Sequence, residues 1–206
     1  MEFFKTGKVL IFVLLLSAFS GASAQETMVT AFKESYTLEQ NGAYAKAIEK
    51  LKSIYDENSY EINLRLGWLN YQAGQFYESK SFYSKAIALK PYAIEPKLGM
   101  AYPAYALGKT EEVISLYQMI LEIDPQNTIA NYRMGLLYYY KGSYEKAESY
   151  FEKVINLYPF DYDSLIMFAW TKLKLQKNKE AKVLFTKALL NKPDDASALE
   201  GLGYIK

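Results

Sequence analysis

The sequence of 206 residues contains neither cysteine nor histidine. Without histidine it lacks the commonest general base and the commonest metal ligand. Because cysteine is missing as well, zinc sites of the usual nitrogen and sulfur type are excluded, and so are Ser-His-Asp and Cys-His catalytic arrangements. Disulfides are also excluded, so the fold must be stabilised by packing alone.

Other catalytic signals are equally scarce. The sequence has no glycine-rich phosphate-binding loop, because its regularly placed glycines are separated by 32 or 34 residues. The adjacent acids Glu111 and Glu112, like Asp194 and Asp195, fall at expected helix starts, where carboxylates interact favourably with the helix dipole. The sequence therefore predicts a protein that is not an enzyme and that binds no cofactor and no metal.

The chain also has no excess of charge of either sign. Residues 1–24 hold two of the 24 basic and one of the 23 acidic side chains, which leaves 22 of each in residues 25–206. Nucleic-acid binding requires a surplus of cations that displaces counterions, so nucleic acid is not expected as a partner.

The one long apolar run lies near the N-terminus. Lys5 and Lys8 precede a run over residues 9–19, and Ala22-Ser23-Ala24 follows it. This is the layout of a secretory signal peptide, and we expect cleavage after Ala24 and export to the periplasm or the cell exterior. The alternative is an uncleaved anchor that would hold the chain at the membrane.

Proline marks a strict period in the rest of the chain. Pro91, Pro125, Pro159 and Pro193 are separated by 34 residues each. A fixed period of this size indicates an array of supersecondary units, each of which buries its apolar face against the next.

Each interval repeats the same internal pattern. A small residue comes first: Gly67, Ala101, Gly135 and Ala169. A turn residue follows seven positions later: Gly74, Gly108, Gly142 and, as the exception, Gln176. A large ring comes next: Tyr83, Tyr117, Phe151 and Phe185. Two apolar-periodic stretches of about a dozen residues flank each turn, which predicts a pair of helices in every repeat.

This pattern resembles the tetratricopeptide repeat family, and the match is close from Met134 to Tyr138 and from Gly142 to Ala147. Sel1-like repeats are the main alternative, but their spacing varies. The resemblance implies an all-α fold, an α-solenoid in which antiparallel helix pairs form a right-handed superhelix. We expect one domain over residues 25–206, with repeats 1 to 5 at about 28–59, 60–93, 94–127, 128–161 and 162–195 and a partial sixth at 196–206.

Aromatic residues make up 16% of the chain, and many of them fall on one stripe of the first helix in each repeat. Positions five, nine and twelve of a repeat share this stripe, because they are separated by four and three residues. The resemblance implies that the stripe lines a concave groove that binds a partner. The predicted groove residues are Phe32, Tyr36, Leu64, Trp68, Tyr71, Leu98, Tyr102, Tyr105, Tyr132, Leu136, Tyr139, Ile166, Trp170, Leu173 and Tyr204. Several of them have a competing interpretation, as packing between neighbouring first helices.

The leading hypothesis is a scaffold module of the bacterial cell envelope that binds a peptide or protein segment in this groove. One alternative is a glycan-binding accessory module, since ring faces stack on sugars. Another is self-assembly through the terminal repeats, because residues 26–61 are rich in acids and residues 170–192 carry seven lysines and one glutamate. Contact with a membrane is expected only through an envelope complex or an uncleaved anchor.

Overall fold

The computed structural model describes residues 25–205. These residues form helices joined by turns, and no strand occurs among them. Backbone contacts divide the chain into two compact units, an N-terminal unit that ends at Pro91 and a C-terminal unit that begins at Tyr92. The expected signal segment, residues 1–24, lies outside the described residues.

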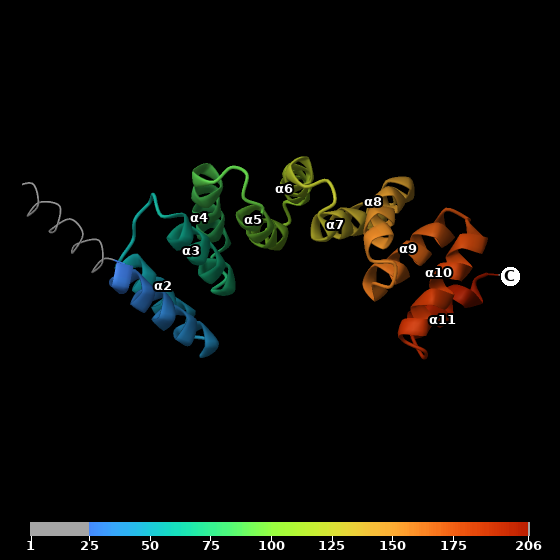
Figure 1. The fold of residues 1–206 in the computed structure, drawn as a ribbon, viewed down its shortest axis with the longest axis horizontal. Coiled ribbons are helices and arrows are strands. Elements are labelled where there is room, and N and C mark those ends of the chain that lie inside the picture. Colours follow the sequence, from blue (N-terminus) through green and yellow to red (C-terminus); the bar gives the residue numbers. More distant parts are fainter. Residues whose placement is uncertain (1–24, 206) are drawn as a thin grey trace, which may run out of the picture. The chain divides into compact units, whose positions relative to one another are not determined.

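The described part of the N-terminal unit, residues 25–91, contains four helices. They are a helix over residues 25–40, α2 (Tyr44–Lys52), α3 (Tyr60–Gln72) and α4 (Phe76–Leu89). Consecutive helices pack together, with the closest association between α3 and α4 (Figure 1). Leu51 of α2 and Leu66 and Leu69 of α3 are fully buried in the core of this unit.

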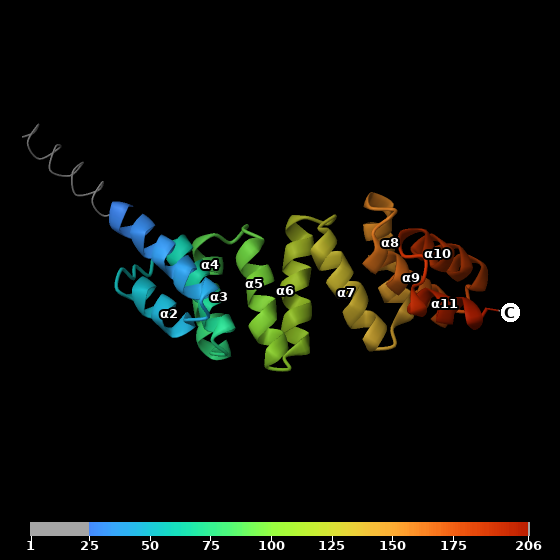
Figure 2. The same ribbon diagram turned by 90° about the horizontal axis from the view of Figure 1, so that it is seen from below.

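The C-terminal unit contains the remaining helices. They are α5 (Glu95–Ala106), α6 (Thr110–Ile123), α7 (Thr128–Tyr140), α8 (Tyr144–Leu157), α9 (Tyr162–Lys174), α10 (Asn178–Asn191) and α11 (Ala196–Gly203). Figure 2 shows α5, α6 and α7 side by side, and each packs on the next. None of the helices described in residues 25–205 combines the length and the apolar character that crossing a bilayer requires.

The helices follow the predicted repeats closely. Helices α3, α7 and α9 begin at Tyr60, Thr128 and Tyr162, the first residues of repeats 2, 4 and 5. The prediction of an all-α fold built from helix pairs is confirmed. The structure adds the reason for these sharp starts, because the residue before each helix caps it. The side chains of Ser59, Asn127 and Asp161 accept hydrogen bonds from backbone N–H groups in the first turn.

Close approach of the two helices in a repeat depends on the small residue predicted for it. The buried Phe151 ring of α8 lies directly on Gly135 of α7, and the Tyr83 ring of α4 lies on Gly67 of α3. A Cβ atom added to Gly135 would be 2.6 Å from the Phe151 ring. The small residue and the ring therefore form one packing device, which recurs in the two units.

The turn inside repeat 5 adopts the same backbone conformation as the others without a glycine. Gln176 has φ of 59°, beside values of 70° to 75° at the glycines in the other turns. Its N–H donates to the carbonyl of Leu173, and the N–H of Lys177 donates to that of Lys172, which closes the end of α9. The left-handed region is unfavourable for a residue with a Cβ atom, so this turn carries local strain.

We expect Gln176→Gly to raise the free energy of unfolding by about 1 kcal/mol, because glycine removes the strain and the hydrogen bonds are backbone only. Urea denaturation followed by circular dichroism measures the effect. Gln75→Gly is the matched control, since Gln75 stands in a turn with φ of −86° and should lose stability on replacement. Equal losses in both variants would show that Gln176 is not strained.

Candidate functional site

The predicted groove residues differ widely in exposure. Tyr36, Tyr102, Tyr105 and Tyr204 are exposed. Most of the others are half-buried: Phe32, Leu64, Trp68, Tyr71, Leu98, Tyr132, Leu136, Tyr139, Trp170 and Leu173. Ile166 is buried, because it packs in the core of the C-terminal unit with Leu165, Ala169 and Phe185. Whether the surface residues bind a partner stays a prediction.

Trp68 joins two first helices of the N-terminal unit. Its indole N–H donates to Glu39 at 2.5 Å, and Glu39 also forms an ion pair with the Arg65 guanidinium at 2.6 Å. Arg65 is buried, with its guanidinium 3.8 Å from the centre of the exposed Tyr36 ring. These contacts hold α3 against the helix over residues 25–40, which is the packing interpretation of Trp68.

Trp170 has a similar role in the C-terminal unit. Its indole N–H donates to Ser197 Oγ of α11 at 2.8 Å, and its ring lies 5.3 Å from Phe185 and 6.2 Å from Tyr204. Both tryptophans are half-buried and both have their N–H groups engaged within the chain. The Trp170 ring also lines an open pocket of about 490 Å³, so stacking on a sugar stays a prediction.

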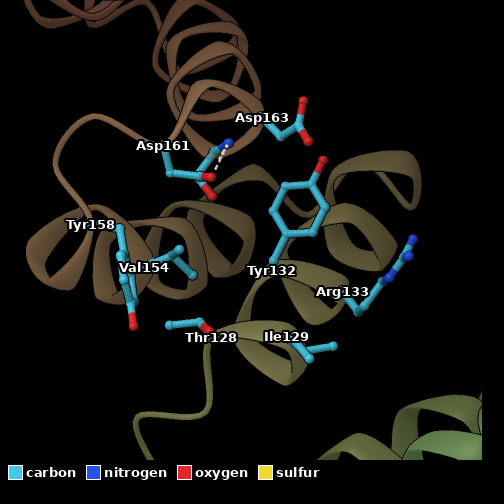
Figure 3. A pocket seen from close by; sticks show the side chains of 9 residues that line it. Thr128, Ile129, Tyr132, Arg133, Val154, Tyr158, Asp161 and Asp163 are labelled. Carbon is cyan, nitrogen blue, oxygen red and sulfur yellow. Dashed lines mark hydrogen bonds between the residues drawn. The ribbon is translucent and has the colours of Figure 1, made fainter.

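Another pocket opens beside Tyr132. It has a volume of about 320 Å³ and lies among α7, α8 and the start of α9. We call it the Tyr132 pocket, and its lining residues are Thr128, Ile129, Tyr132, Arg133, Val154, Tyr158, Asp161, Asp163 and Ser164. Figure 3 shows the Tyr132 ring extending from α7 with its hydroxyl towards Asp163, while the Arg133 side chain extends away from the ring.

The polar groups of this pocket have both signs of charge. Arg133 and Asp163 are exposed, and neither forms an ion pair within the described residues. Burial raises the pKa of the Tyr132 phenol, Asp163 raises it further and Arg133 opposes the rise. The hydroxyl of Ser164 is buried and has no hydrogen-bond partner among the described residues. Asp161 is already engaged, because it accepts the backbone N–H of Ser164.

The pocket also has apolar walls. Val154 is buried, while Ile129 and the Tyr158 ring are more than half exposed. The combination suits an apolar side chain flanked by polar or charged groups. Among residues 25–205, no three acidic side chains come together in a way that could hold a metal ion.

Tyr132 alone among these residues belongs to the predicted stripe. Sequence reasoning missed Arg133, Asp163 and Ser164, because it followed aromatic and aliphatic residues. The signal that could have found two of them is positional. Arg133 follows the predicted Tyr132 directly in repeat 4, and Asp163 is the second residue of repeat 5, one turn before the predicted Ile166.

Comparison with known families agrees with the repeat pattern. Two models of the tetratricopeptide repeat match residues 60–92 and 129–161, which are repeats 2 and 4. The chain is a tetratricopeptide repeat protein. The second match includes most of the Tyr132 pocket. Repeats of this family are protein–protein interaction modules and are typically not catalytic, so the family indicates a role as an interaction scaffold.

Two relatives match this chain over different lengths. The TPR repeat-containing protein YpiA of Bacillus subtilis is 27% identical over 167 residues, which cover 78% of this chain and 39% of YpiA. MJ1428 of Methanocaldococcus jannaschii, also a TPR repeat-containing protein, is 37% identical over 54 residues, or 26% of this chain and 10% of MJ1428. The chain thus spans less than half of either relative.

Solved structures share the tetratricopeptide fold. A tetratricopeptide repeat protein from Parabacteroides merdae is 23% identical with a TM-score of 0.74, over 85% of this chain and 71% of that chain. MamA from Desulfovibrio magneticus is 17% identical with a TM-score of 0.69, over 82% and 98% of the two chains. At these identities the likeness concerns the fold alone.

Proposed function

We propose that this tetratricopeptide chain is a non-enzymatic scaffold of the bacterial cell envelope, which binds a segment of a protein partner through the Tyr132 pocket. The observation that carries the proposal is the pocket itself. It joins first-helix positions of repeats 4 and 5, and its exposed Arg133 and Asp163 have no ion-pair partner within the described residues. The envelope setting rests on the signal-like layout of residues 1–24.

The lining of the pocket defines the segment that fits. Ile129, Val154 and the Tyr158 ring provide apolar contact for one side chain of the partner. Arg133 and Asp163 both lie near Tyr132 and extend in different directions, so they would pair with an acidic and a basic group beside this side chain. A buried apolar anchor inside a polar rim is the usual arrangement of an interaction hot spot.

Photo-crosslinking in cells tests the proposal. Benzoylphenylalanine in place of Ile129, which is 53% exposed at the pocket, is expected to form an adduct with a protein partner. The same group in place of Glu152, an exposed residue of α8, is the matched control and should form none. An adduct of equal yield at both positions, or none at Ile129, would contradict the proposal.

A second variant asks whether the charges recognise the partner. Arg133→Glu should lower the adduct yield at position 129 about tenfold, because it places like charges against the acidic group of the segment. Glu152→Lys changes charge to the same degree outside the pocket and should leave the yield unaltered. Tryptophan variants are unsuitable for this purpose, because Trp68 and Trp170 hold helices together.

A further inference from the structure

The outer face of α10 is basic and apolar. Lys179, Val183, Thr186 and Leu190 follow one another at steps of four, three and four residues, so they form a single stripe along the helix. All four are exposed, and the large apolar side chains are strongly so, Val183 to 64% and Leu190 to 71%. Lys182 is exposed beside this stripe.

The second helices of the preceding repeats provide an internal comparison. The same repeat positions are occupied in α8 by Glu145, Ser149, Glu152 and Asn156, and in α6 by Glu111, Ser115, Gln118 and Glu122. In α4 they are occupied by Tyr77, Ser81, Ser84 and Ala88. Every one of these residues is exposed, so all four helices turn the same face to solvent. Only α10 combines lysine with large aliphatic side chains on this face.

The charge of this face is not cancelled by neighbouring acids. Lys172 and Lys177, which precede it in the lysine-rich stretch, pair with Glu148, and Lys172 also pairs with Glu180. Glu180, the residue that follows Lys179, is therefore already paired with Lys172. Lys179 and Lys182 therefore keep their charge unpaired within the described residues.

The apolar part of the surface continues beyond the helix. Asn191 Nδ2 donates to the carbonyl of Phe160 at 2.9 Å, which places the loop between α8 and α9 at the C-terminal end of α10. Phe160 is 52% exposed in this loop, and Leu190 precedes Asn191. Soluble surfaces display single apolar residues routinely, but lysines interleaved with large apolar residues are typical of a surface that meets lipid headgroups.

We propose that the outer face of α10 rests on the surface of an anionic lipid bilayer. Lys179 and Lys182 would lie among anionic headgroups, while Val183 and Leu190 enter the boundary between headgroups and acyl chains. A second copy of the chain is less suitable, because its acidic faces on α6 and α8 have no large apolar side chain to cover Val183 and Leu190. This contact is separate from the Tyr132 pocket and does not depend on a protein partner.

A fluorophore on the face itself gives the sharpest test. The chain has no cysteine, so Thr186→Cys in the full chain takes one environment-sensitive nitrobenzoxadiazole label in the middle of the stripe. With phosphatidylglycerol vesicles at low salt we expect a blue shift and a rise in emission, both largely reversed at high salt. Glu152→Cys carries the label at the same repeat position of α8 and should not respond. Both chains share residues 1–24, so insertion of that segment cannot produce the difference.

A charge variant completes the design. Lys179→Glu with Lys182→Glu should raise the lipid concentration for half-maximal response by at least about 20-fold, since each lysine near an anionic surface contributes about a fivefold gain. Lys33→Glu with Lys46→Glu, at exposed positions of the N-terminal unit, should have little effect. The proposal is overturned if the label at 186 is silent with vesicles, responds equally to phosphatidylcholine, or responds only to polyglutamate, which would indicate an acidic protein.

Discussion

Gly135→Leu is expected to lower the free energy of unfolding by about 3 kcal/mol or more, enough to unfold much of a marginally stable stack. The Phe151 ring is fully buried and leaves no room for a side chain, since even a Cβ atom would be 2.6 Å from it. Leucine favours a helix over glycine by about 1 kcal/mol, which does not offset this overlap. Urea denaturation monitored by circular dichroism measures the loss.

The chain contains its own control for this prediction. Gly203 occupies the same position of the partial sixth repeat as Gly135 does in repeat 4, and a Cβ atom added there meets nothing within 4 Å. Gly203→Leu should therefore change stability by no more than about 1 kcal/mol, in the favourable direction. If both variants lose the same stability, the cost does not come from the Phe151 contact.

The repeat pattern predicted the helices well because their signals are local. A capping residue starts a first helix, a left-handed residue ends it, and a small residue faces a ring in the next helix. Each of these needs only a few neighbouring residues, which is why α7 and α9 begin 34 residues apart as expected. Gln176 shows that the turn conformation persists even where the glycine is missing.

Exposure along the predicted stripe depended on neighbours that the pattern does not specify. A repeat position states which side of its own helix a residue faces, but not what covers that side. Ser197 and Tyr204 of the following segment cover Trp170, and Glu39 of the preceding repeat engages Trp68. The tryptophans are the largest rings of the stripe, so they have the most area to bury and pack accordingly.

The lysine-rich stretch was only partly understood from sequence. A count of seven lysines against one glutamate indicates a basic end. The structure separates these lysines by their partners, because Glu148 of α8 lies beside Lys172 and Lys177 although it is 24 residues or more away in sequence. On the outer face of α10, the positive charge without an ion pair within the described residues comes from Lys179 and Lys182. This is fewer lysines than the composition of the stretch indicates.

Glu148→Leu should have the other large effect, a loss of about 3 kcal/mol in the free energy of unfolding. Lys172 is buried, with Nζ 2.5 Å from both Glu148 and Glu180, so it joins α8, α9 and α10. Glu180 is 55% exposed and cannot replace Glu148, whose side chain is only 17% exposed. The variant leaves the buried Lys172 ammonium group with Glu180 as its one acidic partner among the described residues. Removing one member of a buried ion pair costs more than replacing both members.

The network also predicts how stability depends on pH. Burial opposes ionisation of Glu148, but hydrogen bonds from Lys172 and Lys177 outweigh it and lower the pKa of the carboxyl below 4.5. Its contribution is therefore present above that pH and is lost as the pH falls through the lowered value. The stability difference between the parent chain and Glu148→Gln should shrink in this acidic range, as parallel urea titrations would reveal.

The double variant Glu148→Leu with Lys172→Met distinguishes two costs. One is the loss of the ion pair between these residues, and the other is the cost of leaving the Lys172 ammonium group buried without Glu148. The double variant replaces both charged partners by apolar side chains of similar size, and such replacements are often close to neutral. We therefore expect it to be more stable than Glu148→Leu alone by about 2 kcal/mol, although it carries one more substitution. A double variant that loses the sum of the two single losses would mean that Glu148 and Lys172 act independently, and it would contradict this explanation. A partial recovery would place the cost of Glu148→Leu in the unpaired ammonium group of Lys172, which the methionine removes.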